Sequence, residues 1–146
     1  MFAKAISQKN CKGVEVTEFS RHLQKISDKI KTIEPAEAIE LHRLKEVCFV
    51  DLRDGFERLE HGTIPDAEHC PRGSLEFRIP RESEYHRSYF SKIKRFVFYC
   101  SHGQRSILAT DTAGQMGLDD VCHIRGGMKA WIEAGGAVAT HQDPGA

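Results

Sequence analysis

The sequence predicts an α/β protein in which a mostly parallel sheet is covered by helices on both faces. Short apolar runs occupy residues 47–50, 95–99 and 121–124, and the continuous run at 95–99 is typical of a strand buried on both faces. Segments with helical spacing of apolar residues stand between these runs. Strands that alternate with helices in this way favour a parallel sheet with helices packed against it.

Length and composition narrow the class of protein. The chain has 146 residues, 40% hydrophobic and 29% charged, with a formal net charge of zero. These values are typical of one soluble globular domain and give no global charge that favours nucleic acid or an acidic membrane. The chain has no apolar run near the ~20 residues of a membrane helix, and its start lacks a signal-peptide core. Its five cysteines include no Cys-x-x-Cys pair, which argues against a disulfide framework or zinc ribbon and favours the reducing cytoplasm.

An amphipathic helix is predicted near the N-terminus, with Thr17 or a neighbour close to its start. The helix either packs on its own domain or pairs with a second copy, since its spacing also fits a short heptad seam. We assign residues 1–34 to an N-terminal extension, 35–136 to the main domain and 137–146 to a flexible tail. The apolar stripe recurs at steps of three and four and consists of Val16, Phe19, Leu23, Ile26, Ile30 and Ile33.

Proline, glycine and apolar spacing predict the remaining elements. Pro35 suits the first turn of a helix. The four-residue recurrence of Leu108, Thr112 and Met116 indicates a helix, which Gly117 ends as a left-handed C-cap. The expected elements after residue 35 are, in order, a helix, a strand at 47–50, a short helix at 54–60, a turn at 62–65, a brief strand at 68–70, a strand at 95–99, a helix at 107–116, a strand at 121–124, a turn at 126–127 and a helix at 128–134.

The seven residues from Cys100 to Ser106, Cys-Ser-His-Gly-Gln-Arg-Ser, form a loop between a strand and a helix. Ligands of open α/β sheets bind outside the carboxyl ends of the strands, where this loop lies. Backbone N–H groups and the helix dipole can converge there, with Gly103 free to adopt positive φ and Arg105 as a permanent cation. A cysteine facing this array should ionise more readily than a free thiol. The loop therefore predicts a site for a thiolate and an anion, unless Cys100 is a buried, inert end of the strand.

The motif Cys-x-x-Gly-x-Arg-Ser resembles the active-site loop of the rhodanese domain, a sulfurtransferase fold. The resemblance covers about residues 35–136 and implies a mostly parallel five-stranded sheet with helices on both faces, to which the N-terminal helix is an addition. Thr63 and Asp66 stand where the family often has histidine and glycine. The other family-like segments are Asp51-Leu52-Arg53, Gly62-Thr63-Ile64-Pro65-Asp66-Ala67, Gly126-Gly127 and Ala130-Trp131.

The resemblance also implies roles for individual residues. Cys100 and Arg105 are the expected catalytic residues, and Asp51 and Arg53 the expected structural support. The Asp51 carboxylate either orients Arg105 or the loop, or pairs locally with Arg53. The residues expected to bind substrate are Ser101, His102, Gly103, Gln104, Ser106 and Arg72.

The assignments of His102 and Arg72 have alternatives, and so do the roles of Cys70 and of residues 78–95. His102 could tune the charge of the loop or contact substrate, or it faces solvent as a spectator. Arg72 lies in Pro-Arg-Gly-Ser-Leu-Glu-Phe, which resembles a segment of some rhodanese-like proteins; it either lines the anion pocket or is a surface residue. Cys70 could resolve a persulfide, but a structural role is simpler. The basic and aromatic residues at 78–95 could attract small anions, although a solvated loop and helix explains them more simply.

The leading functional hypothesis is transfer of a sulfane sulfur. The Cys100 thiolate would take sulfur from a small anionic donor such as thiosulfate and pass it to a thiol or cyanide, without a metal or organic cofactor. One alternative is a persulfide carrier for a protein partner. Another is a cysteine phosphatase or arsenate reductase. The resemblance implies that the loop of those enzymes is one residue longer than the six residues from Cys100 to Arg105. We expect no nucleic-acid or membrane partner, and either a monomer or a homodimer.

Overall fold

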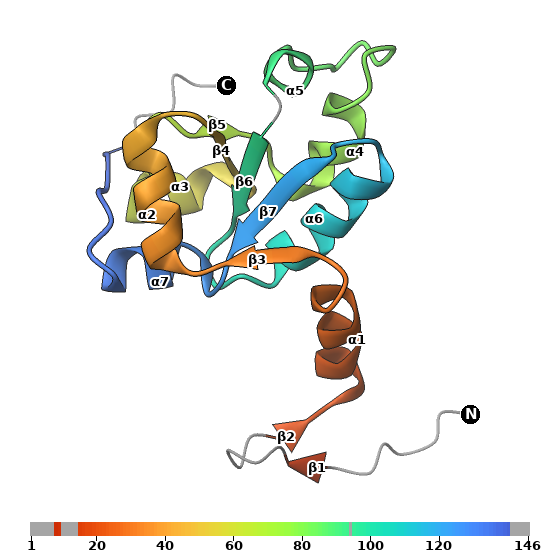
Figure 1. The fold of residues 1–146 in the computed structure, drawn as a ribbon, viewed down its shortest axis with the longest axis vertical. Helices are drawn as coiled ribbons and strands as arrows, with labels where there is room; N and C mark the ends of the chain where they lie inside the picture. The colour runs from red at the N-terminus through yellow and green to blue at the C-terminus, as the bar shows by residue number, and fades with distance from the viewer. Residues whose placement is uncertain (1–7, 10–14, 94, 141–146) are drawn as a thin grey trace.

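A computed structural model describes residues 8–9, 15–93 and 95–140 and contains a five-stranded parallel sheet (Figure 1). Its strand order is β3-β7-β6-β4-β5, and every neighbouring pair is parallel. The predicted fold class is thereby confirmed. The strands are β3 (Lys31–Ile33), β4 (Cys48–Asp51), β5 (Glu68–His69), β6 (Arg95–Tyr99) and β7 (Asp120–Ile124), and a separate antiparallel pair is formed by β1 (Gln8–Lys9) and β2 (Glu15–Val16).

Helices lie on both sides of this sheet. In Figure 1, α2 and α7 lie on one side of the sheet, and α4 and α6 lie on the other. Among the described residues, no helix is long and apolar enough to cross a bilayer. The helices are α1 (Glu18–Ser27), α2 (Pro35–Leu44), α3 (Gly55–His61), α4 (Leu75–Arg78), α5 (Tyr89–Lys92), α6 (Arg105–Gln115) and α7 (Gly127–Glu133), with a 3₁₀ turn η1 at Arg72–Ser74.

The alternation of side chains along β4 and β6 divides the core into two layers. Phe49 and Val97 are buried with Trp131 of α7, whereas Phe96 and Phe98 are buried on the opposite face. Cys100 continues the second series beyond the end of β6 and packs in the layer that also contains α6 residues. The strand therefore delivers the cysteine side chain to the start of α6.

The N-terminal stripe is divided among β2, α1 and β3 rather than forming one helix. Thr17 caps α1, because its side chain accepts a hydrogen bond from the Ser20 N–H at 3.0 Å and the Ser20 hydroxyl accepts one from the Thr17 N–H. The prediction that the helix continues to Ile33 was wrong. Residues 31–33 are the edge strand β3, in which Ile33 pairs with Ile124 and is almost fully buried. The segment assigned to an extension thus supplies one strand of the central sheet.

The first residues beyond α7 contact the main domain. Ala139 and Thr63 exchange backbone hydrogen bonds of 2.9 and 2.8 Å, and the Trp131 indole N–H donates to the Ala137 carbonyl at 2.8 Å. In the neighbouring turn, Asp66 has φ +65°, a conformation that glycine adopts without steric cost. Residues 141–146 of the predicted tail and Cys11 lie outside the described residues.

Candidate active site

The loop after β6 encloses the sulfur of Cys100. The cysteine is only 1% exposed, and the Gly103 N–H donates a hydrogen bond to its Sγ at 3.2 Å. Gly103 has φ +91°, and a Cβ there would lie 2.9 Å from the Gly126 nitrogen. The glycine thus lets the loop fold back over the sulfur. We expected several backbone N–H groups to converge on the sulfur. Among the described residues, the Gly103 N–H is the one that donates to Sγ.

The start of α7 holds the same loop from the other side. The Met128 N–H donates to the Cys100 carbonyl at 2.8 Å, and the Lys129 N–H donates to the Ser101 carbonyl at 3.1 Å. These N–H groups belong to the first turn of α7, where they have no partner within their own helix. Gly127 makes the approach possible, since it has φ +64° and a Cβ there would lie 2.4 Å from the Cys100 carbonyl oxygen. The paired glycines are therefore part of the site and not only a turn.

Arg105 is oriented by Glu57 of α3. Its guanidinium donates two hydrogen bonds to the Glu57 carboxylate, at 2.9 and 2.8 Å, and the Ser101 hydroxyl donates a third at 2.8 Å. The hydrogen bond from Arg105 is the main reason that the pKa of Glu57 falls to about 2. The carboxylate that contacts Arg105 is thus Glu57 and not Asp51. Asp-x-x-Glu at residues 54–57 is a capping-box pattern that could have placed Glu57 in a first helical turn.

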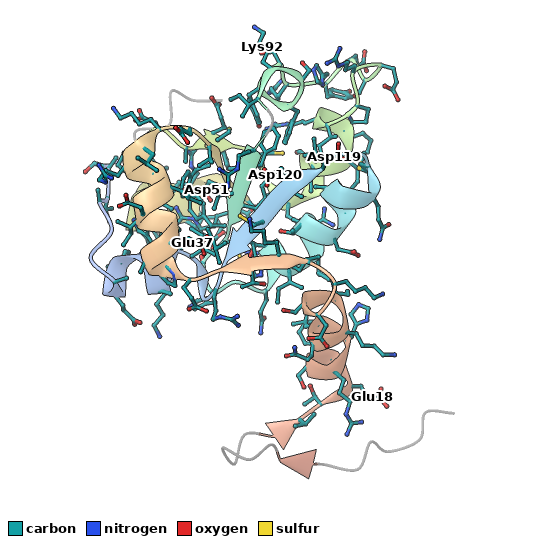
Figure 2. The ribbon with its side chains drawn as sticks, in the orientation of Figure 1. Glu18, Glu37, Asp51, Lys92, Asp119 and Asp120 are labelled. Atoms are coloured by element: carbon teal, nitrogen blue, oxygen red, sulfur yellow. The ribbon has the colours of Figure 1, made fainter. Side chains whose placement is uncertain are left out.

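Asp51 pairs with Arg53, which is the local alternative expected from the sequence for its carboxylate. Its carboxylate accepts hydrogen bonds from the Arg53 side chain at 3.0 and 2.8 Å and from the Tyr99 hydroxyl at 2.9 Å. Arg58 of α3 adds a contact at 3.3 Å, and all of these groups are buried inside the molecule, where Figure 2 labels Asp51. This cluster ties the end of β4 to β6 and to α3. It places Glu57, one residue before Arg58, within reach of the loop.

A cavity of about 460 Å³ opens beside the loop, between α3 and α7. Ser101, His102 and Arg105 line it together with Arg53, so predicted catalytic, substrate-binding and supporting residues share this cavity. Lys129 adds a second flexible cation, and exposed Phe56 lies on the α3 side. The cavity therefore combines cationic and apolar surface next to the covered cysteine.

Ser106 faces inward rather than toward this cavity. It is fully buried and accepts a hydrogen bond from the Cys100 thiol, with an Sγ–Oγ distance of 3.6 Å. On its other side, the Ser106 Oγ lies 2.9 Å from Nδ1 of His123. Burial, with a smaller contribution from Arg125, lowers the pKa of His123 to about 4. His123 was missed from the sequence because it stands in a buried strand with no motif around it.

The remaining predicted site residues lie at the edges of the site or away from it. Gln104 is exposed and lines a second cavity with His102. Arg72 is not brought to the cysteine: its guanidinium contacts Glu76 at 2.7 Å and Thr112 of α6 at 3.3 Å. Its part in substrate binding stays a prediction. Cys70 is fully buried, and burial raises the pKa of its thiol, which favours the structural interpretation.

Fold and site together define a class of α/β proteins that carry a cysteine loop between a central parallel strand and a helix. A family model for the rhodanese-like domain matches residues 34–134. The chain belongs to this family. The match covers more than half of the chain and includes the complete loop, Glu57 and His123.

Relatives with sulfurtransferase names are similar to this chain. Mouse thiosulfate sulfurtransferase/rhodanese-like domain-containing protein 3 is 32% identical over 93 residues, which are 60% of this chain and 59% of that protein. The chain thus spans less than two thirds of the mouse protein. A sulfurtransferase from Allochromatium vinosum is 33% identical over 91 residues, which are 62% of this chain and 77% of that protein. These names support a sulfurtransferase-type function.

Solved structures also resemble this fold. A protein of unknown function from Rhodopseudomonas palustris, described as a possible tyrosine phosphatase, is 39% identical with a TM-score of 0.80, over 92% of this chain and 100% of that one. A human single-domain sulfurtransferase is 27% identical with a TM-score of 0.60, over 70% of this chain and 95% of that one. The two descriptions name different reactions for proteins of similar fold. The fold therefore does not decide between these reactions, and the geometry of the site has to.

Proposed function

We propose that the protein transfers a sulfane sulfur from thiosulfate, or a similar small anionic donor, to a thiol or cyanide through a persulfide on Cys100. The observation that carries the proposal is the hydrogen bond from the Gly103 N–H to Sγ, at the start of a helix whose first residue is Arg105. An N–H donor and a helix N-terminus favour a negative charge on sulfur. Such a charge is needed both in the attacking thiolate and in the persulfide anion.

In the first half-reaction, the Cys100 thiolate attacks the outer sulfur of thiosulfate. A new S–S bond forms at Cys100, the S–S bond of thiosulfate breaks, and its electron pair leaves with sulfite. Arg105, Lys129 and the Glu57 carboxylate line the cavity through which the donor would enter. Because Glu57 offsets one of the two cations, a net positive charge remains to attract the dianion. Glu57 holds the guanidinium in place by two hydrogen bonds, so little reorganisation is needed when the donor arrives.

In the second half-reaction, an acceptor thiolate or cyanide attacks the outer sulfur of the persulfide. The persulfide S–S bond breaks, and its electron pair returns to Cys100 as the thiolate. Gly103 can stabilise this leaving thiolate with the same N–H that it offers to the resting sulfur. Two half-reactions that share one covalent intermediate predict ping-pong kinetics.

Intact-mass measurement after thiosulfate treatment tests this proposal. We expect the protein to gain one sulfur atom and to lose it on addition of cyanide, with release of thiocyanate. Cys100→Ser is the matched variant and should gain no sulfur. Absence of the mass gain in the wild-type protein, or its survival in Cys100→Ser, would contradict the proposal.

Phosphate-ester hydrolysis is a second candidate because of the description of the Rhodopseudomonas palustris structure. A cysteine phosphatase needs the fork of its loop arginine for the phosphoryl oxygens. Here both terminal nitrogens of Arg105 donate to Glu57, which favours sulfur transfer. The comparison to make is thiosulfate turnover against hydrolysis of an aryl phosphate by the same preparation. Faster hydrolysis of the phosphate ester would reverse the order of the two candidates.

A protein acceptor is the third candidate, favoured by apolar surface at the cavity. Phe56 is 62% exposed and Ile132 46%, and both line the cavity with Lys129. Exposed apolar side chains beside a reactive centre suit contact with a protein more than with a small anion. If the physiological acceptor is a protein cysteine, Phe56→Ser should weaken transfer to it while leaving transfer to cyanide unchanged.

A further inference from the structure

A chain of hydrogen-bonded polar side chains connects the sulfur of Cys100 to Thr32, on the side of the loop that faces α1. It runs from Sγ to the Ser106 Oγ at 3.6 Å, from that oxygen to Nδ1 of His123 at 2.9 Å, and from Nε2 of His123 to the Thr32 Oγ1 at 2.9 Å. Its members come from the loop, α6, β7 and β3. Thr32 and His123 are register partners in the parallel pair of β3 and β7, so the sheet itself holds this contact.

The chain leads from an almost fully covered sulfur to an open cavity. Cys100 is 1% exposed and His123 2%, whereas Thr32 is half-buried. Thr32 and His123 both line a cavity of about 260 Å³ beneath α1, which is large enough for several water molecules. The Gly103 amide that contacts Sγ can only donate. Among the described residues that contact Sγ, the Ser106 hydroxyl is therefore the group that can accept the thiol proton.

We propose that the proton of Cys100 passes along Ser106, His123 and Thr32 to water in the cavity beneath α1. After this transfer, the Ser106 hydroxyl donates a hydrogen bond to the thiolate. This inference rests on the proposed function, because the proton transfer supplies the thiolate that attacks the sulfur donor. Ser106 touches the reacting sulfur. His123 and Thr32 act through Ser106 and are positioning residues.

Each step of this transfer balances. In the thiol state, the Cys100 S–H donates to Ser106, the Ser106 O–H donates to Nδ1 of His123, and the Nε2–H donates to Thr32. When a water molecule in the cavity accepts the Thr32 hydroxyl proton, each proton behind it moves one bond toward the cavity. The result is a thiolate at Cys100 and one proton in the cavity water. The Ser106 O–H now donates to the sulfur, and His123 carries its proton on Nδ1.

The imidazole remains neutral before and after this transfer, which agrees with its surroundings. The charged or titratable groups that line the cavity are His102 on the loop and Arg125 after β7, and α1 contributes Ser20, Leu23, Gln24 and Ser27. Arg125 pairs with Glu34 at 2.7 Å. Because burial and Arg125 lower the pKa of His123 to about 4, an imidazolium is disfavoured at neutral pH. A change of tautomer requires no such charge.

The rate at which iodoacetamide alkylates Cys100 reports the thiolate, and its pH profile tests the chain. The modified peptide is quantified by mass spectrometry in the full-length protein, so the other cysteines do not interfere. We expect Thr32→Val to reduce alkylation several-fold at pH 7 and Ser106→Ala by about tenfold, since each removes hydrogen bonding that supports the charged sulfur. Thr32→Ser, which keeps the hydroxyl, should restore the wild-type profile.

The high-pH limit separates this role from a merely structural one. Above the pH at which alkylation levels off, all variants should react at the wild-type rate, because the thiolate is then fully formed. Profiles of Thr32→Val that superimpose on the wild type, or a loss that persists at high pH, would overturn the proposal. Alkylation requires no sulfur donor. A failure of persulfide formation would therefore refute the proposed function without altering this result.

Nuclear magnetic resonance of the His123 ring nitrogens gives a second, direct measurement. Above the His123 pKa of about 4, we expect the ring to be neutral with its proton on Nε2, and this proton to appear on Nδ1 instead as Cys100 ionises. Cys100→Ala, which has no thiol to ionise, should keep one tautomer over the same pH range. An unchanged tautomer in the wild-type protein would rule out the proposed proton transfer through His123.

Discussion

Arg105 and Glu57 lie 48 positions apart in the chain and form a two-point ion pair, with N–O distances of 2.9 and 2.8 Å. The same carboxylate accepts the Ser101 hydroxyl at 2.8 Å. Glu57 thus joins the loop residue after the cysteine to the first residue of α6. This three-way contact gives the candidate active site its fixed cation, and it depends on the position of α3.

Removal of the Glu57 charge should slow the first half-reaction. We expect Glu57→Gln to lower the second-order rate of persulfide formation from thiosulfate about tenfold, because hydrogen bonds to charged groups contribute about 1.5–3 kcal/mol and these orient Arg105. Quenched-flow mass spectrometry measures this rate. Glu60→Gln, on the same helix and exposed, is the matched control and should react like the wild type. Equal rates for both variants would show that Arg105 needs no such orientation.

Glu57 should also make stability depend on pH in the acid range. Its pKa falls from 4.5 to about 2 in the folded protein, so the ionised form stabilises the fold above pH 4.5 and this contribution is lost as the pH falls through about 2. We expect the wild type to exceed Glu57→Gln by on the order of 1–2 kcal/mol at pH 6, allowing for solvent screening of the half-exposed Arg105. Urea unfolding at several pH values should show this difference shrinking only below pH 4.5.

The buried Asp51 cluster should be among the most sensitive positions of the fold. Asp51→Asn leaves the buried guanidinium groups of Arg53 and Arg58 without a counter-charge. We expect a loss of about 3–5 kcal/mol in the free energy of unfolding. Asp120→Asn breaks the exposed pair with Arg95 and should cost less than about 1 kcal/mol. A small effect of Asp51→Asn in urea unfolding would mean that water or other groups replace the carboxylate.

Gly127 tests the contact between α7 and the loop. Gly127→Ala adds a Cβ that would lie 2.4 Å from the Cys100 carbonyl oxygen at φ +64°, so the loop or α7 must move. Gly135 has φ +88° but no atom within 4 Å of such a Cβ, which makes Gly135→Ala a control for backbone strain alone, about 1–2 kcal/mol. We expect Gly127→Ala to lose stability beyond that amount and to lose at least tenfold in persulfide formation. Similar behaviour of the two variants would show that the contact is dispensable.

The two faces of α1 should respond differently to truncation. Leu23 is 6% exposed, and α1 contacts α6, so Leu23→Ala should cost about 2–3 kcal/mol of stability in thermal or urea unfolding. Phe19 is 58% exposed, and Phe19→Ala should change the stability of a monomer by less than about 0.5 kcal/mol. Sedimentation of both variants tests the alternative of a homodimer. Dissociation caused by Phe19→Ala would assign the exposed face of α1 to a subunit interface.

Local sequence was enough to predict the fold class and the position of the cysteine loop between β6 and α6. Continuous apolar runs and helical spacing predicted a parallel sheet because period and burial are properties of neighbouring residues. The cysteine loop was predicted for the same reason, since the strand end, Gly103 and the helix start follow one another in the chain. The same local rule misled at Ile33. An apolar residue at helical spacing can equally lie in an edge strand, and pairing with β7 decided between them.

Sequence alone therefore determined which kind of sheet the chain forms, and it predicted which segment holds the candidate catalytic cysteine. Only the tertiary structure decided which distant groups surround that segment: Glu57 rather than Asp51 beside Arg105, and His123 and Thr32 behind Ser106. The physical reason is that hydrogen bonds and ion pairs depend on distances between atoms. Chain folding brings β3, β7 and α3 to the loop through packing that no local pattern encodes.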